Sequence, residues 1–242
     1  MPEETLPIVN TQFMEMLSFI THELKSPLDS IITLGKTLTD GYYGTIEDEQ
    51  KSIVDRMVKK AEYLAAISAG LLHLALFESG KLKPNPDLVD LFDGVILPAI
   101  EIIVPQIEEN QMDFRQDIRE NIYPAVCDAN LIKIVIVNFL SNAVKYGKKK
   151  GRIWISMKNA YKKYIISVWN EGRGFTKSEK EMLFQKFSRI QAPELLRKKG
   201  TGVGLYVSWQ IINLHGGTVT AESDPGSWAE FTIQLPKYPE IS

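Results

Sequence analysis

Four polar side chains that suit a magnesium–phosphate ligand fall close together in the segment NFLSNAVKY, residues 138–146. Asn138 and Asn142 are four residues apart, so a helix would place both on one face, with Lys145 and Tyr146 adjoining it. An amide oxygen is a suitable ligand for Mg²⁺, and an ammonium is a point donor for phosphate oxygens. The segment alone leaves two readings open, a nucleotide site and an ordinary solvated face.

The helix that would carry these side chains is indicated by the residues before them. Residues 131–137 are almost wholly apolar, which predicts a buried helix over residues 129–146. Polar groups able to bind a ligand would then line an element that otherwise packs into a core.

A first glycine-rich stretch, NEGRGF at residues 170–175, follows a predicted strand. Gly172 and Gly174 would let the backbone approach a flat ligand closely, and Asn170 could hydrogen-bond a base edge. The plain alternative is a strand-to-loop turn with glycine at positive φ.

A second glycine-rich stretch, GTGVGL at residues 200–205, leads into an apolar-periodic helix. Such a turn presents free N–H groups and the positive end of a helix dipole to phosphates. The P-loop reading fails because the Gly-Lys-Ser/Thr ending is absent. The Rossmann reading fails because no parallel βαβ unit with an acidic residue about twenty positions on is evident.

The segment between the two glycine stretches reads as a lid over a ligand. LFQKFSR, residues 183–189, precedes the polar residues 191–199. Phe184 and Phe187 are expected to be its apolar anchors, and Arg189 to reach phosphate. An amphipathic helix followed by a loop would also explain the aromatic residues.

The first eighty residues predict a helical hairpin. Apolar residues recur in steps of three and four over residues 13–38 and 53–74, and DGYYGT, residues 40–45, forms a turn between them. One hairpin leaves apolar seams on both helices, so two copies are expected to pair as a four-helix bundle and form a homodimer.

His22 stands in the segment HELKSP, residues 22–27, inside the first predicted helix. Pro27 in a helix costs roughly 3 kcal/mol and frees the carbonyl of Glu23 one turn earlier. His22 falls off the apolar seam, so its ring is expected to face solvent. An exposed histidine beside a kink fits these facts, and so does a nucleophilic imidazole with Glu23 as its base or orienting partner.

Gly80, Pro84 and Pro86 end the helical pattern and predict a domain boundary, with domains at residues 1–82 and 83–242. The second domain is expected to be a two-layer α/β sandwich, which makes the whole chain α+β. Its strands are expected near residues 113–118, 152–158, 164–169, 217–221 and 229–235. Its helices are expected near residues 91–110 (bent or split at Pro98 and Pro105), 129–146, 178–187 and 203–215.

Composition is that of an ordinary globular protein: 242 residues, 44% hydrophobic, 24% charged and a net charge of −2. The charge argues against electrostatic binding to nucleic acid. The single cysteine, Cys127, excludes an intrachain disulfide and suits a reducing, cytoplasmic setting. No signal peptide and no apolar run of about 18 residues is evident, so no membrane segment is expected in this chain. The three histidines are too scattered for a zinc site.

Residues 22–27 resemble the phosphoacceptor box of sensor histidine kinases, whose pattern is His-Glu-x-Lys/Arg-Ser/Thr-Pro. The resemblance implies that His22 takes the γ-phosphoryl group of ATP and that Glu23 is the general base. It also implies that the hairpin dimerises and docks the receiver domain of a response regulator.

The second half resembles the ATP-binding domain of histidine kinases and of the wider gyrase, Hsp90, histidine kinase and MutL group. Residues 138–146 match the asparagine box, 170–175 and 200–204 the two glycine boxes, and 184–187 the phenylalanine box; the likeness spans residues 11–236. It implies ATP and Mg²⁺ as cofactors, with Asn142 as metal ligand and Lys145 on phosphate. The implied nucleotide-binding set is Asn138, Asn142, Lys145, Tyr146, Asn170, Gly172, Gly174, Phe187, Arg189, Gly200, Thr201, Gly202, Val203, Gly204 and Leu205.

Two positions depart from the family pattern. The first glycine box usually begins with Asp, which recognises the adenine amine, whereas this chain has Asn170. An Asp carboxylate only accepts hydrogen bonds, while an amide can also donate, so discrimination against GTP should be weaker. Ser26 stands where bifunctional members usually have Thr or Asn, so the resemblance does not extend to phosphatase activity.

The sequence therefore predicts an ATP-dependent protein histidine kinase that autophosphorylates His22 and passes the phosphoryl group to an aspartate of a response regulator. It is expected to act in the cytoplasm, as the core of a longer sensor protein. Two rivals remain. One is a non-catalytic dimeric interaction module, and the other is an ATPase of the same superfamily without phosphotransfer.

Overall fold

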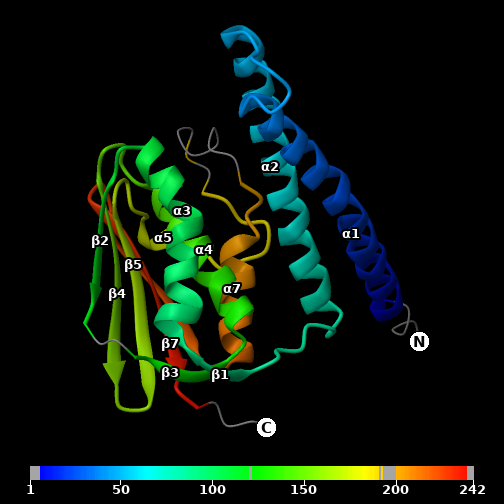
Figure 1. The fold of residues 1–242 in the computed structure, drawn as a ribbon. Helices are drawn as coiled ribbons and strands as arrows, with labels where there is room; N and C mark the ends of the chain where they lie inside the picture. The colour runs from blue at the N-terminus through cyan, green and yellow to red at the C-terminus, as the bar shows by residue number, and fades with distance from the viewer. Residues whose placement is uncertain (1–5, 120–121, 191, 193–199, 239–242) are drawn as a thin grey trace. The chain divides into compact units, whose positions relative to one another are not determined.

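The computed structural model describes residues 6–119, 122–190, 192 and 200–238, and of residues 6–15, 17 and 18 it describes the backbone only. The chain divides into two compact units, Met1–Lys83 and Pro84–Ser242. Each unit is considered by itself (Figure 1).

The first unit is a hairpin of two long helices, α1 (Leu6–Thr39) and α2 (Asp48–Glu78), which run side by side (Figure 1). They approach closely at Gly35, where a Cβ atom would overlap the side chain of Val58. Five apolar side chains described in the first unit are buried: Leu28, Val58, Ala61, Leu74 and Ala75. The predicted hairpin is confirmed, and α1 continues through Pro27.

A second apolar seam on the hairpin is exposed. Leu34 is 58% exposed, and several large apolar side chains of both helices share its exposure: Ile20, Leu24, Ile31, Leu38, Ile53, Met57 and Leu64. Exposed apolar side chains at helical spacing are typical of a surface that another helix pair covers.

Within the described residues, α2 is the one helix long and apolar enough to cross a membrane, with a mean hydropathy of 1.3 over 18 residues. The expectation that the chain holds no such segment is therefore not met here. Length and composition carry little weight by themselves, because a core helix of a soluble protein passes the same test.

The second unit is built on a five-stranded sheet of order β2-β4-β5-β7-β6. Its strands are β2 (Asp113–Ile118), β4 (Arg152–Ala160), β5 (Lys163–Glu171), β6 (Thr218–Asp224) and β7 (Trp228–Pro236). All neighbours pair antiparallel except β2, which runs parallel to β4. The five strands expected from the sequence all form.

Three helices cover one face of this sheet: α3 (Leu97–Glu109), α4 (Ala129–Tyr146) and α7 (Gly204–Leu214) (Figure 1). Alternate residues of β4 and β5 point into the core between the sheet and these helices. The buried residues there are Ile153, Ile155, Tyr164, Ile166 and Val168. The result is the predicted two-layer sandwich, with α4 at the middle of the helical layer.

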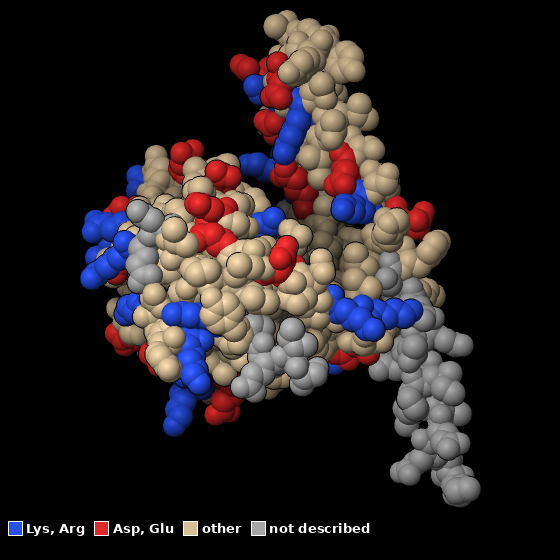
Figure 2. All heavy atoms as spheres, turned by 60° about the horizontal axis from the view of Figure 1, so that its bottom comes forward, with Lys and Arg blue, Asp and Glu red and all other residues tan. Residues whose placement is uncertain are grey.

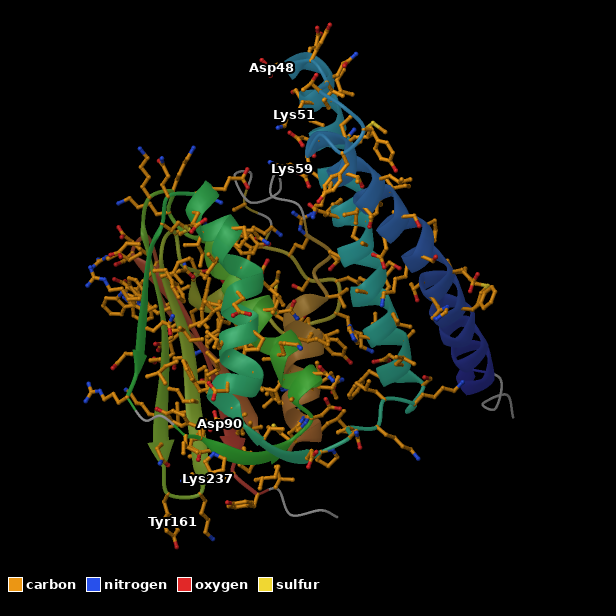
Figure 3. All side chains as sticks on the ribbon, viewed as in Figure 1. Asp48, Lys51, Lys59, Asp90, Tyr161 and Lys237 are labelled. Carbon is orange, nitrogen blue, oxygen red and sulfur yellow. The ribbon has the colours of Figure 1, made fainter. Side chains whose placement is uncertain are left out.

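A separate two-stranded sheet, β1 (Asp87–Asp90) paired with β3 (Pro124–Cys127), was not predicted. Both strands are four residues long, too short for a reliable alternating pattern. Asp90 links them to the next helix, because its carboxylate accepts hydrogen bonds from the backbone N–H groups of Phe92, Asp93 and Tyr123 (Figure 3).

The helix expected over residues 91–110 begins as a π-helix, η1 (Phe92–Ile96), and continues as α3. Pro98 lacks an N–H group, and the wider turn before it is closed by the N–H of Leu97 bonding to the carbonyl of Phe92, five residues earlier. The predicted split therefore occurs at Pro98, while Pro105 lies inside α3.

The helix expected over residues 178–187 is wrong in extent. Thr176 and Glu179 form a capping box, but the helix that follows, α5 (Lys177–Lys180), has only one turn. Beyond it, the N–H groups of Met182, Leu183 and Gln185 bond to carbonyls three residues earlier rather than four. The chain continues in tight turns instead of an α-helix.

Charged side chains of both signs are interspersed on the surface shown in Figure 2, without one dominant field. This distribution agrees with the net charge of −2. The described residues on this face give no electrostatic reason to expect nucleic acid as a partner.

Candidate functional site

Helix α4 positions the first group of candidate residues. Asp128 caps its N-terminus by accepting hydrogen bonds from the N–H groups of Asn130 and Leu131, at 3.0 and 3.1 Å. The helix ends at Gly147, where a Cβ atom would collide with the carbonyl of Ala143. Its bounds are those predicted. Its apolar face is buried, with Leu131, Ile132, Val135, Ile136, Phe139, Leu140, Ala143 and Val144 inside.

Asn138 joins α4 to the start of α7. Its amide nitrogen donates to the carbonyl of Gly204 at 3.3 Å and to the hydroxyl of Ser208 at 3.2 Å. Gly204 lies against the Asn138 amide, since a Cβ atom there would be in van der Waals contact with it, 3.5 Å from its Oδ1. Asn142, one turn further along α4, is half-buried on the same side of the helix.

Lys145 and Tyr146 border the second glycine stretch. A Cβ atom on Gly200 would overlap the Lys145 ammonium and lie 3.6 Å from the Tyr146 hydroxyl. Burial, with the positive charge of Arg189 as the second cause, lowers the pKa of Lys145 to about 8. Burial also raises the pKa of Tyr146, although Arg189 acts in the opposite direction. The structure thus brings Lys145, Tyr146, Gly200 and Arg189 together.

The second glycine turn is held in a conformation that only glycine adopts readily. Gly202 has φ of 72°, and a Cβ atom there would lie 2.6 Å from the carbonyl oxygen of Ser188. Val203 is fully buried and its N–H bonds to the hydroxyl of Thr201 at 3.3 Å. The turn opens directly into α7, whose first residues are Gly204 and Leu205, so its free N–H groups lie at a helix N-terminus.

The first glycine stretch meets the C-terminal end of α4. Gly147 and Gly172 form an isolated β-bridge, and a Cβ atom on Gly172 would lie 3.0 Å from the carbonyl oxygen of Tyr146. Asn170, at the end of β5, is 3% exposed and faces the helical layer. Its amide nitrogen donates to the carbonyl of Glu171 at 3.3 Å, which leaves its oxygen as the group that can accept.

Gly174 is locked by a serine that sequence reasoning missed. It has φ of 65°, and a Cβ atom there would overlap the Ser223 hydroxyl. That hydroxyl accepts from the N–H of Phe175 at 2.8 Å and donates to the carbonyl of Trp228 at 2.7 Å. No signal in the sequence links Ser223 to the glycine stretch, because Ser223 lies on β6 and Gly174 lies in the loop after β5.

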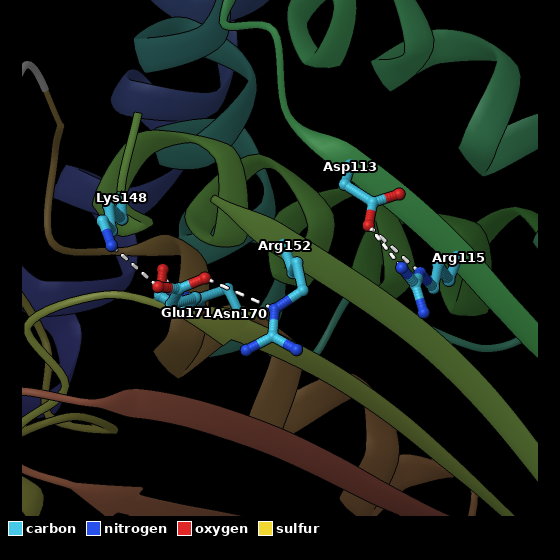
Figure 4. A network of polar contacts seen from close by, with 6 residues as sticks. All are labelled: Asp113, Arg115, Lys148, Arg152, Asn170 and Glu171. Carbon is cyan, nitrogen blue, oxygen red and sulfur yellow. Dashed lines mark hydrogen bonds and ion pairs between the residues drawn. The ribbon is translucent and has the colours of Figure 1, made fainter. Parts of the chain in front are cut away.

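Ion pairs surround Glu171, which lies in the first glycine stretch. Glu171 bonds Lys148 at 2.9 Å and Arg152 at 3.4 Å, beside Asn170 (Figure 4). The hydrogen bond from Lys148 is the main reason that the pKa of Glu171 lies below its usual range. A second pair joins Arg115 to Asp113 on the neighbouring strand.

The predicted lid is described only at its start. Phe184 is half-buried, whereas Phe187 is 60% exposed and has φ of 57°. Phe187 is therefore not an apolar anchor in this structure, which corrects that expectation. Residues 191 and 193–199, most of the expected lid, lie outside the described residues.

His22 and Glu23 lie on α1 in the first unit. The His22 side chain is 79% exposed, and its Nδ1 lies 3.4 Å from Glu23 Oε1. One open hollow along the helix is lined by His22, Lys25, Ser26, Asp29, Ser30, Thr33 and Leu34. The predicted exposure of His22 is confirmed, and its ring is accessible to a reactant.

Two family models match the chain. Residues 14–80 match the His Kinase A (phospho-acceptor) domain, and residues 127–239 match the histidine kinase-, DNA gyrase B- and HSP90-like ATPase. The first model contains His22, and the second contains every predicted nucleotide-binding residue.

Named relatives are histidine kinases. The chain is 27% identical over 226 residues to the circadian input-output histidine kinase CikA of Synechococcus elongatus, covering 92% of this chain and 30% of that protein. It is 25% identical to the sensor-like histidine kinase SenX3 of Mycolicibacterium smegmatis, covering 93% of this chain and 58% of that one. The chain thus spans less than two thirds of these relatives.

A solved structure shows the same fold. ShkA, crystallised at full length with AMPPNP, superposes with a TM-score of 0.72 at 20% identity, over 94% of this chain and 47% of that one. The two family models, the named relatives and this fold agree. The chain belongs to the histidine kinases, as a catalytic core that joins a phospho-acceptor domain to an ATP-binding domain.

Proposed function

We propose that this chain transfers the γ-phosphoryl group of ATP to Nε2 of His22 and then to an aspartate of a response regulator. One observation carries the proposal: an exposed His22–Glu23 pair stands on one unit, and a glycine turn faces the polar side of α4 in the other.

The ATP-binding role rests on the ATPase domain and on the groups gathered at the second glycine turn. Free N–H groups at the start of α7, the Lys145 ammonium and Arg189 supply positive potential for phosphates. Asn170, with its oxygen turned to accept, is proposed to bind the exocyclic amine of adenine.

Mg²⁺ is proposed to bind at Asn142. Among the described residues, no group of three His, Cys, Asp or Glu side chains could hold a metal ion. The available donors are therefore an amide oxygen and the phosphates of the nucleotide, a set that suits Mg²⁺ because this ion keeps several waters and binds substrate phosphates. When bound, the ion offsets negative charge on the phosphates.

At His22 the chemistry needs one bond made and one broken. Nε2 attacks the γ-phosphorus, the bond to the β-phosphate oxygen breaks, and ADP leaves. Glu23 accepts the Nδ1 proton, a role that its position 3.4 Å from that nitrogen supports. The carboxylate also fixes the ring so that Nε2 is the attacking atom.

Dimerisation is proposed to occur through the exposed seam of the hairpin. Leu34, Met57 and Leu64 are each more than half exposed, although they occur at core spacing. A second hairpin would cover them and form a four-helix bundle. The same hairpin is proposed to dock the receiver domain of a response regulator, in the cytoplasm, where ATP is available and Cys127 stays a free, buried thiol.

The test is incubation with γ-labelled ATP followed by treatment of the labelled protein with acid and with base. A phosphoramidate on histidine is lost in acid and retained in base, so acid-labile, base-stable label supports the kinase. Free phosphate without labelled protein would indicate an ATPase. If neither labelled protein nor free phosphate is formed, the chain is a non-catalytic interaction module.

A further inference from the structure

A buried polar contact ties the two helices of the hairpin together one residue before His22. Among the described side chains of the first unit, two polar ones are buried: Thr21, 4% exposed, and Ser68, 6% exposed. The hydroxyl of Ser68 on α2 donates to the backbone carbonyl of Thr21 on α1, at 3.0 Å. The contact joins residues 47 positions apart in the sequence.

Packing alone does not explain the hydroxyl at position 68. The buried positions before and after it on α2 include Ala61 and Ala75, so alanine fits this interface. A buried hydroxyl is unfavourable unless it is hydrogen-bonded.

The bond that Ser68 makes is also unlike those of other hydroxyls in the hairpin. Ser30, Thr33 and Thr37 each bond to the carbonyl four residues earlier in their own helix. Ser68 instead bonds across to the other helix, so its hydroxyl fixes the position of one helix against the other.

The hydrogen bond between Ser68 and Thr21 lies next to a turn of α1 that lacks one backbone hydrogen bond. Pro27 has no N–H group, so the carbonyl of Glu23 loses its partner in the helix, and helices bend at such sites. Thr21 is held against α2, and the next residue lies 100° further around the helix, which directs the His22 side chain outward.

We propose that Ser68 is a positioning residue for phosphoryl transfer: through the Thr21 carbonyl it holds the turn that carries His22, beside the loosened turn at Pro27. The role of this turn rests on the proposed function, whereas the anchor itself does not. Ser68 bonds to the Thr21 carbonyl rather than to the imidazole, so its proposed effect passes through the backbone of α1.

The test replaces Ser68 with Ala in the full chain and measures the initial rate of His22 labelling. The rate at saturating ATP should fall about three- to tenfold, the value of one hydrogen bond, while KM for ATP stays unchanged. Ser79→Ala is the matched control, because it removes a hydroxyl that bonds only to its own helix, at Leu76. This control should label within twofold of wild type.

A second control separates positioning from loss of stability. Val58→Ala weakens the same helix interface far from the His22 turn, and should lower the midpoint of denaturation more than Ser68→Ala while lowering the labelling rate less. If the labelling rates of the two variants instead follow their stabilities, the positioning role is refuted.

Amide hydrogen exchange tests the anchor without activity. In Ser68→Ala the amides of residues 22–25 should exchange about three- to tenfold faster, while those of residues 58–64 change little. If exchange becomes faster by the same factor throughout the hairpin, or does not change at all, the anchor is refuted. If the wild-type chain carries no label on His22, the proposed function fails, and the exchange result still decides whether Ser68 holds this turn.

Discussion

The two units carry their chemistry in opposite ways. In the hairpin, His22 stands on an exposed helix surface, with its side chain 79% exposed. In the second unit, Asn170 is buried at the end of β5, and partial burial beside the second glycine turn shifts the pKa values of Lys145 and Tyr146. An acceptor must be reached by its donor and by its partner, whereas a binding site gains from groups that are held in place beforehand.

The units also differ in how many elements must come together to make their contacts. In the hairpin, a contact such as that of Ser68 with Thr21 joins two consecutive helices. The proposed nucleotide site depends on contacts between elements that other strands and helices separate, such as Asn138 with Ser208 and Phe175 with Ser223. Local patterns can therefore predict the first unit more fully than the second.

The largest expected effect is the loss of dimerisation when a charge is placed in the hairpin's exposed seam. Leu34→Glu would bury a carboxylate in each copy of the proposed bundle, and should raise the dimer dissociation constant at least ~10³-fold, on the order of 4 kcal/mol. Sedimentation of the variant checks this. Thr45→Glu adds the same charge at an exposed turn and should remain dimeric. A wild-type chain that sediments as a monomer would contradict the bundle.

The next effect concerns Asn142 in the second unit. Removing the proposed Mg²⁺ ligand should lower the labelling rate about 10²-fold, because charge on the transferred phosphate is then less well offset. Asn142→Ala is compared with Asn130→Ala, an exposed asparagine in the first turn of the same helix. If the two variants label equally well, Asn142 belongs to a solvated face.

A smaller effect follows from the pKa of Lys145. Its pKa of about 8 means that the ammonium loses its proton as pH rises above 8, and the phosphate contact is lost with it. ATP affinity should fall about tenfold between pH 7 and pH 9, as calorimetry can measure. In Lys145→Arg the charge persists, so this decrease should disappear. An equal decrease in both proteins would assign the pH dependence to another group.

The same pKa predicts the sign of a stability change. Because the pKa of Lys145 is lower in the folded chain than in the unfolded one, the unfolded state binds more protons between pH 8 and the usual lysine value. This group's contribution to stability should therefore rise with pH across that interval, and Lys145→Met should remove the rise.

The smallest effect concerns base selectivity at Asn170. Asn170→Asp should widen the ATP/GTP affinity ratio by at most about tenfold, on the order of 1.4 kcal/mol for a charge-assisted bond. It should also lower stability, because the amide's bond to the Glu171 carbonyl is lost and a carboxylate faces that oxygen instead. An unchanged ratio would mean that Asn170 does not contact the base edge.

Sequence patterns located most of the elements but not the side-chain contacts that join them. The capped, apolar-periodic helix α4 has its predicted bounds, since Asp128 and Gly147 end it locally. The helix predicted over residues 178–187 was wrong in extent, because a capping box starts a helix but does not extend it. The strands β1 and β3 were not predicted, because a strand of four residues carries too little periodicity to be recognised.

The candidate site shows the same division. Residue types at fixed spacing identified Asn138, Lys145 and both glycine stretches. The partners that hold them, Ser208 and Ser223, have no signal in the sequence, because each lies on an element that reaches the site only after folding. Phe187 is exposed and has φ of 57°, and the sequence indicated neither.

The central claim is that His22 is the phosphoryl acceptor, and one matched pair of variants tests it. His22→Gln and His73→Gln make the same substitution on the two helices of the hairpin, and His73 is half-buried on α2. With γ-labelled ATP, His22→Gln should carry no label, His73→Gln should label like wild type, and both should bind ATP within a few-fold of wild type. Wild-type labelling of His22→Gln would contradict the account.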